Sequence, residues 1–229
     1  MTSGAMPRIE PDSEPKAGLV SIGTANSLMV FEAVPGEALK MVHYGARQDD
    51  LAEFECSGIK SQDYYPALGL TPHDTFAMAA VQPDGNMTLD LRVTSVEKGG
   101  WEGGETLCIT TQDSFYPFSV RHIFKSYRDE DIIEASAEVT NSGRRPVTLT
   151  RCQSSTLPIR VGNVWATTFY GSWASECGLC TEPLTRGVKI IRSVEGSRNS
   201  QGAHAEAIIS LDGKPDETQG RVIGAALCW

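Results

Sequence analysis

The stretch IIEASAEVTNSG, residues 132–143, decides the fold class of this chain. Its apolar residues alternate with polar ones, and successive side chains of a β-strand point to opposite faces. The pattern predicts a half-buried strand that places these residues on one face: Ile133, Ala135, Ala137 and Val139. Asn141, Ser142 and Gly143 follow at once and predict a turn, because Asn and Gly tolerate a positive φ.

The same alternation recurs elsewhere, as in LDLRVT at 89–94, and turn residues separate such runs at 83–86 and 212–215. No window of eleven or more residues keeps the apolar spacing of a helix without a Gly, a Pro or a β-branched run. About a dozen strands with one apolar face must bury those faces against each other. The sequence therefore predicts an all-β fold, a large antiparallel β-sandwich.

Length and charge exclude several classes of function. With 229 residues and 40% apolar content, the chain suits one large domain, which we place at 18–229 after a polar, flexible leader at 1–17. The formal net charge is −9, and no basic block exceeds Arg144-Arg145, so we expect no nucleic-acid partner. No apolar run approaches about 20 residues, and no signal peptide opens the chain. We expect a cytoplasmic protein without a membrane partner.

Six cysteines are scattered along the chain, and we expect reduced thiols. Cys177 and Cys180 have the spacing of half a zinc site or of a redox pair. Zinc usually needs a second such pair, whereas the four histidines stand alone in the sequence. We therefore interpret the two as ordinary cysteines beside a loop, and we predict no metal and no cofactor.

Six segments in a fixed order carry a resemblance to a known family. They are YYPALG at 64–69, QPDGNMTLDLRVTSVE at 82–97, the long run from Tyr116 to Arg151, TTFYGSWASE at 167–176, PLTRGVKIIRSVEGSRNS at 183–200 and GRVIGAALCW at 220–229. Their order and spacing resemble the N-terminal domain of the glycoside hydrolase family 36 α-galactosidases, from about Gly18 to the last residue. The resemblance implies an antiparallel β-supersandwich of the galactose-mutarotase-like type.

The resemblance also implies a function for a longer protein. In the family, two Asp carboxylates of a following (β/α)8 barrel perform retaining hydrolysis. The chain stops at Trp229, where relatives continue toward that barrel, so we expect no catalytic residue in this chain and no activity by itself. The implied partners are the barrel, a homo-oligomer such as the tetramer of many relatives, and α-galactosyl oligosaccharides of the raffinose and melibiose type.

Two features of the chain could suggest chemistry without the barrel. Asp129-Glu130-Asp131 is the densest acidic cluster, but neighbouring side chains at the start of a strand diverge, so we expect a solvated turn. His122 lies within SVRHIFKSY without a nucleophile pattern around it, and we expect a core or surface histidine.

Candidate sugar contacts come from the resemblance. TTFYGSWASECG, residues 167–178, matches a family segment whose Trp helps to wall the galactose pocket, which carries that role to Trp173. The alternative is that Phe169 and Tyr170 pack inward while Trp173 closes a domain interface. Ser175 stands where many members have Arg.

The loop after YYPALG also departs from the family pattern, and His73 and Asp74 lie at its tip. They could meet the sugar or a neighbouring subunit, although an ordinary polar loop is the alternative. A different class of function also stays open, in which the sandwich acts alone as a carbohydrate-binding or structural module.

Overall fold

The structure is a computed structural model that describes residues 18–48, 51, 54, 61–69, 75–159, 162–192, 202–218 and 220–228. These residues divide into two compact units, with the division between Pro158 and Ile159, and each unit is described by itself. The leader expected at 1–17 lies outside the described residues. None of the described segments forms a helix long and apolar enough to cross a membrane.

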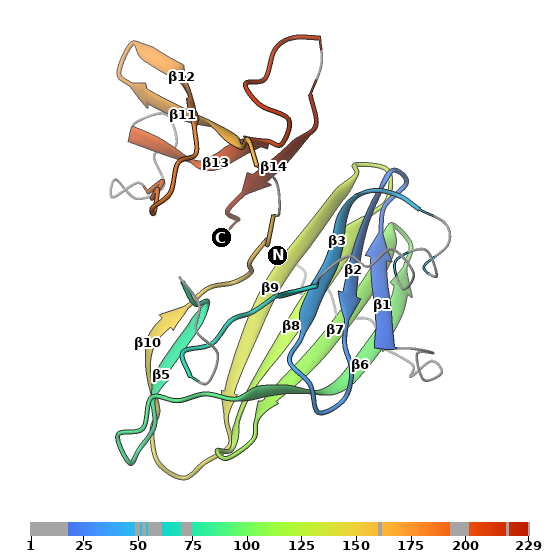
Figure 1. Cartoon of the computed structure of the whole chain (residues 1–229), viewed down its shortest axis with the longest axis vertical. Helices are drawn as coiled ribbons and strands as arrows, with labels where there is room; N and C mark the ends of the chain where they lie inside the picture. Colours follow the sequence, from blue (N-terminus) through green and yellow to red (C-terminus); the bar gives the residue numbers. More distant parts are fainter. Residues whose placement is uncertain are drawn as a thin grey trace, which may run out of the picture. The chain divides into compact units, whose positions relative to one another are not determined.

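Unit 1 contains three antiparallel sheets (Figure 1). The first has the order β1-β2-β3-β4, with β1 at Leu19–Gly23, β2 at Ser27–Glu32, β3 at Lys40–Ala46 and β4 at Gln62–Asp63. The second is a meander of β6 at Leu91–Trp101, β7 at Gly104–Asp113, β8 at Phe118–Tyr127 and β9 at Ile132–Asn141. The third pairs β5 at Met78–Val81 with β10 at Thr148–Cys152.

Unit 2 is one antiparallel sheet in the order β12-β11-β13-β14. Its strands are β11 at Trp165–Ser172, β12 at Ser175–Pro183, β13 at Gly202–Ser210 and β14 at Val222–Ala226. Every strand ladder of the described residues is antiparallel, and only isolated bridges are parallel. The all-β, antiparallel fold predicted from the sequence is confirmed.

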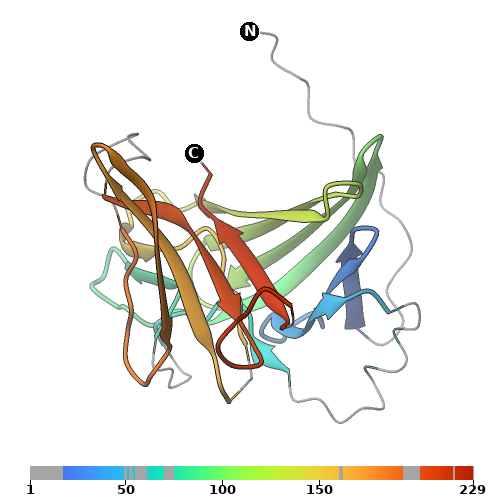
Figure 2. The same ribbon diagram turned by 90° about the horizontal axis from the view of Figure 1, so that it is seen from above.

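The core of unit 1 lies between the β1–β4 sheet and the concave side of the curved β6–β9 sheet (Figure 2). Strand β8 shows why: every second side chain is buried from Phe118 to Ser126, as a two-residue period requires. The ring of Phe31 on β2 contacts Phe124 of β8, with centroids 4.7 Å apart, and Tyr64 at 5.1 Å. Strand β9 follows its predicted alternation, since Ile133 to Val139 pack their apolar side chains on this core.

The YYPALG segment forms hydrogen bonds that connect the residues after β10 to this core. The Tyr64 hydroxyl lies 2.7 Å from Ser155 Oγ, and burial raises the pKa of Tyr64 to about 12. The Tyr65 hydroxyl donates to the carbonyl of Gln153, and burial raises its pKa as well. Both phenols therefore stay protonated and serve as structural hydrogen-bond partners.

Candidate functional site

The aromatic-rich segment 167–178 folds as the β11–β12 hairpin of unit 2. Ser172 pairs with Ser175, so Trp173 and Ala174 form a two-residue turn at its tip. Ala174 has a φ of 60°, a left-handed value that is uncommon for a residue with a Cβ. The backbone geometry of the turn thus places the Trp173 side chain at the end of a β-ribbon.

Trp173 is 84% exposed, and it makes no hydrogen bond or ring contact with the part of the chain that the structure describes. The other two aromatics behave differently. Phe169 is half-buried and stacks on the ring of His204, with centroids 6.3 Å apart. Tyr170 lies across the hairpin over Gly178 and is 51% exposed. Phe169 therefore packs against β13 and Tyr170 against β12, and the Trp173 indole is left exposed.

His73 and Asp74 lie outside the described residues. Ser175 begins β12 and is exposed.

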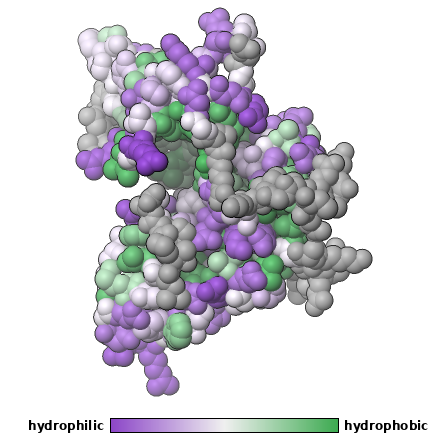
Figure 3. All heavy atoms as spheres, viewed as in Figure 1, coloured by the Kyte–Doolittle hydropathy of each residue, from purple (hydrophilic) through white to green (hydrophobic). Residues whose placement is uncertain are grey.

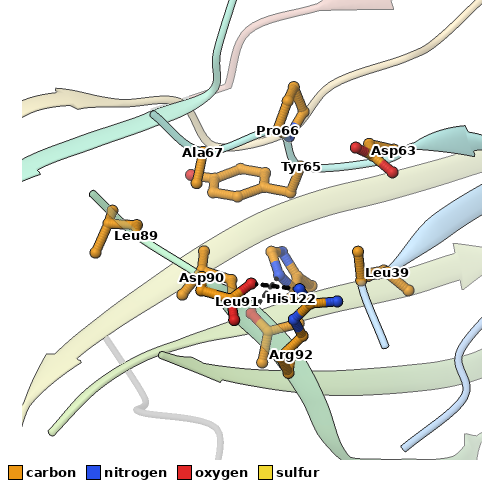
Figure 4. Close-up of a pocket in the computed structure, with 12 residues that line it drawn as sticks. Leu39, Asp63, Tyr65, Pro66, Ala67, Leu89, Asp90, Leu91, Arg92 and His122 are labelled. Atoms are coloured by element: carbon orange, nitrogen blue, oxygen red, sulfur yellow. Dashed lines mark hydrogen bonds and ion pairs between the residues drawn. The ribbon is translucent and has the colours of Figure 1, made fainter. Parts of the chain in front are cut away.

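His122 is one of the residues that line a small pocket of unit 1 (Figure 4). Asp90 and Arg92 form an ion pair of 2.7 Å among the lining residues, and Leu39, Tyr65 and Pro66 complete the wall. The volume is about 70 Å³, enough for a few water molecules.

The hydrogen bonds around His122 indicate which ring nitrogen carries the proton. Thr111 Oγ1 lies 3.3 Å from the Val120 carbonyl and 3.3 Å from His122 Nε2. A carbonyl only accepts, so when the hydroxyl donates to Val120, Nε2 must carry the ring proton and donate to Thr111. Burial lowers the pKa of His122 to about 3, so the ring is neutral near pH 7. His122 is a core residue. The sequence pattern alone had left both a core and a surface position open.

The acidic turn at 129–131 connects β8 to β9. Asp129 and Glu130 are exposed, as expected for a solvated turn. Asp131 has a φ of 57°, and its carboxylate accepts a hydrogen bond from the Thr24 hydroxyl in the β1–β2 turn. Thr24 holds the pKa of Asp131 below its usual value. The Asp131 carboxylate therefore connects the β8–β9 turn to the β1–β2 turn.

Cys108, Cys152, Cys180 and Cys228 form no disulfide within the part of the chain that the structure describes, and reduced thiols stay a prediction. The side chain of Cys177 lies outside what the structure describes. Within the described ranges, no three His, Cys, Asp or Glu side chains gather as metal ligands would.

Unit 2 also exposes apolar side chains away from the hairpin tip. Figure 3 shows hydrophobic residues in view on this unit. Leu179 on β12 is 62% exposed, and Val188 and Ile190 in the segment after it are 82% and 73% exposed.

Comparison with known families gives the class of the chain. Residues 37–229 match the family model of the glycosyl hydrolase family 36 N-terminal domain. The chain belongs to this family. The predicted relationship is therefore confirmed over most of the described fold.

A curated relative of this family 36 domain is the α-galactosidase Mel36A of Lactobacillus acidophilus. It is 25% identical over 180 residues, which cover 72% of this chain and 24% of the relative. The chain thus spans about a quarter of the length of the curated relative that it matches.

Solved structures agree with this fold. The α-galactosidase AgaA of Geobacillus stearothermophilus superposes with a TM-score of 0.79 at 20% identity, covering 90% of this chain and 33% of that one. AgaB from the same organism gives 0.79 at 19% identity, with 95% and 34% covered. The α-galactosidase of Lactobacillus brevis gives 0.74 at 19% identity, with 90% and 32% covered. Variants of AgaA have been solved with raffinose and with stachyose.

Proposed function

We propose that this family 36 domain serves as the non-catalytic N-terminal domain of a retaining α-galactosidase. The substrates of that enzyme would be terminal α-D-galactosyl residues of oligosaccharides of the raffinose and melibiose type. The match over residues 37–229 to the family 36 N-terminal domain carries this proposal. Solved relatives of the same fold, bound to raffinose or stachyose, support the substrate class.

Within that enzyme, Trp173 would help to wall the sugar pocket. An exposed indole at the end of a ribbon offers a flat apolar face to the C–H side of a sugar and an N–H to a hydroxyl. His73 and Asp74 would contribute further polar contacts to the sugar or to a neighbouring subunit. The exposed apolar residues of unit 2 would meet the catalytic barrel or another subunit in an oligomer.

The first test uses the chain as it stands. Hydrolysis of an aryl α-galactoside and calorimetric binding of raffinose are measured side by side. We expect no turnover and no tight binding, because the proposed chemistry belongs to a barrel. Turnover by the chain would overturn the non-catalytic role, and binding without turnover would instead favour a stand-alone carbohydrate-binding module.

A second test addresses Trp173 in the full-length protein. Replacing the indole by Trp173→Ala should raise the KM for raffinose by about two- to tenfold, the range expected for losing one aromatic contact. Trp173→Phe should recover part of this loss. Phe115→Ala is the matched control, because Phe115 is also exposed, at 77%, but lies in the β7–β8 turn of unit 1. Equal effects of Trp173→Ala and Phe115→Ala would remove Trp173 from the sugar pocket.

A further inference from the structure

A second pocket of unit 1 lies where three strand connections meet. The connections are 82–86 between β5 and β6, 114–117 between β7 and β8, and 142–147 between β9 and β10. The pocket has a volume of about 210 Å³, three times that of the His122 pocket. Pro83, Pro117 and Val147 give it apolar walls.

Two arginines line this pocket without a salt bridge to any described residue. Arg144 and Arg145 are exposed, and neither side chain forms an ion pair or hydrogen bond within the part of the chain that the structure describes. By contrast, Arg92 pairs with Asp90, and Arg221 forms a two-pronged pair with Asp212. Two guanidinium groups without a salt bridge beside one pocket favour a ligand that carries negative charge.

Gln82 gives a second, independent indication. Its side chain lines the pocket and is only 3% exposed, and its amide nitrogen Nε2 is buried without a hydrogen-bond partner among the described residues. A buried donor left unpaired costs about 1–3 kcal/mol, so most such groups have a partner. A ligand that supplies an acceptor oxygen to this amide would remove that cost.

Hydrogen bonds hold Asp84 and Tyr116 of the pocket in place, with Asn86 beside them. Asp84 accepts from the Asn86 backbone N–H at 3.0 Å and from the Tyr116 hydroxyl at 2.8 Å. Tyr116 in turn accepts from Asn86 Nδ2 at 2.9 Å. Asp84 offsets one arginine charge, which leaves a net positive pocket with a fixed aromatic wall.

We propose that this pocket binds a small carboxylate with an apolar body. The carboxylate would meet the guanidinium groups of Arg144 and Arg145, the apolar body would pack on Pro117 and Val147, and Gln82 would donate its amide hydrogens. Such a group could belong to a free organic acid or to an acidic side chain on a second copy of this chain.

The test measures calorimetric binding of benzoate to the full chain, with benzamide as a neutral probe of the same shape. We expect weak binding of benzoate that falls as salt is added, and weaker binding of benzamide. Removing both charges in the Arg144→Gln, Arg145→Gln double variant should lower the benzoate affinity about tenfold or more. The Arg186→Gln, Arg192→Gln double variant removes the same charge from unit 2 and should bind benzoate as the wild type does.

Three outcomes would overturn the proposal: no benzoate binding, equal affinity for the two probes, or unchanged affinity in the Arg144→Gln, Arg145→Gln double variant. Sedimentation of the same proteins separates the two sources of the carboxylate. If a second copy supplies it, benzoate and the double variant should both reduce self-association. If a free acid supplies it, both leave the mass unchanged.

Discussion

The ring of Tyr170 lies against the backbone of Gly178 on the neighbouring strand of the hairpin, so a Cβ at Gly178 would stand 2.6 Å from Cε2 of that ring. This contact explains part of the aromatic cluster: a strand glycine has no side chain to pack, and the ring covers it. Phe169 stacks on His204, and Trp173 is the most exposed of the three aromatic side chains.

Gly178→Ala should therefore displace the Tyr170 ring. Alanine gains about 0.5–1 kcal/mol over glycine in a strand, and here the clash offsets that gain. Gly224→Ala on β14 is the control, because a Cβ added at Gly224 would meet no atom within 4 Å. Urea unfolding should show Gly224→Ala more stable than Gly178→Ala by about 1 kcal/mol. Equal stability would mean that Tyr170 does not hold this position.

Ala174→Gly should stabilise the hairpin turn. The φ of 60° costs a residue with a Cβ about 1 kcal/mol, and glycine adopts it freely. The unfolding free energy should rise by about 0.5–1 kcal/mol. Ser175→Gly, at the neighbouring position without a positive φ, should lower it by a similar amount. A loss of stability in Ala174→Gly would contradict this geometry.

His122 should make the stability of unit 1 depend on pH. Its folded pKa is about 3, below the value of about 6.5 of an unfolded histidine, so the unfolded chain takes up the proton first. Stability should be full above about pH 6.5 and fall by about 1.4 kcal/mol per pH unit as the pH drops from there toward 3.

The His122→Phe variant keeps a ring in the core and removes this titration, so its unfolding free energy should depend less on pH between about 6.5 and 4. Thr111→Val removes the hydrogen bond to the ring and keeps the titratable group. Thr111→Val should therefore keep the wild-type dependence of the unfolding free energy on pH. Parallel pH profiles for wild type and His122→Phe would show that another group carries the dependence.

Asp131 should make the free energy of unfolding depend on pH in the acid range. The Thr24 hydroxyl and the β1–β2 turn hold its folded pKa below that of the unfolded chain. Its contribution is therefore present above an ordinary Asp pKa and is lost as the pH falls through the lower, folded value. Asp131→Asn keeps a side-chain acceptor for Thr24 and tolerates the positive φ, so only the acid part of the profile should flatten. An unchanged acid limb would contradict the contact.

Local alternation was enough to predict the strands. Leu89, Leu91 and Val93 are buried as the pattern indicated, and the turn at 83–86 contains Gly85 with a φ of 88°. The alternation of LDLRVT holds until Val93, where a bulge before Ser95 shifts the register with β7. A bulge inserts one residue without changing composition, so the sequence did not reveal it.

The division into two units was not predicted either, since residues on both sides of Pro158 carry the same strand pattern. The single domain expected at 18–229 therefore stays a prediction. The pocket of Arg144 and Arg145 was also missed. Its lining comes from three connections spread over residues 82–147, and only the folded meander brings them together.

The sequence by itself determined the class of fold and the family, because strand alternation, turn residues and six segments in order are properties of neighbours along the chain. Only the tertiary structure decided which side chains are buried, which are exposed, and which pair over long distances in the sequence. It placed His122 neutral in the core, left the Trp173 indole exposed, and paired Asp131 with Thr24 across 107 positions. Burial and long-range pairing depend on the packing of distant strands, which no local pattern records.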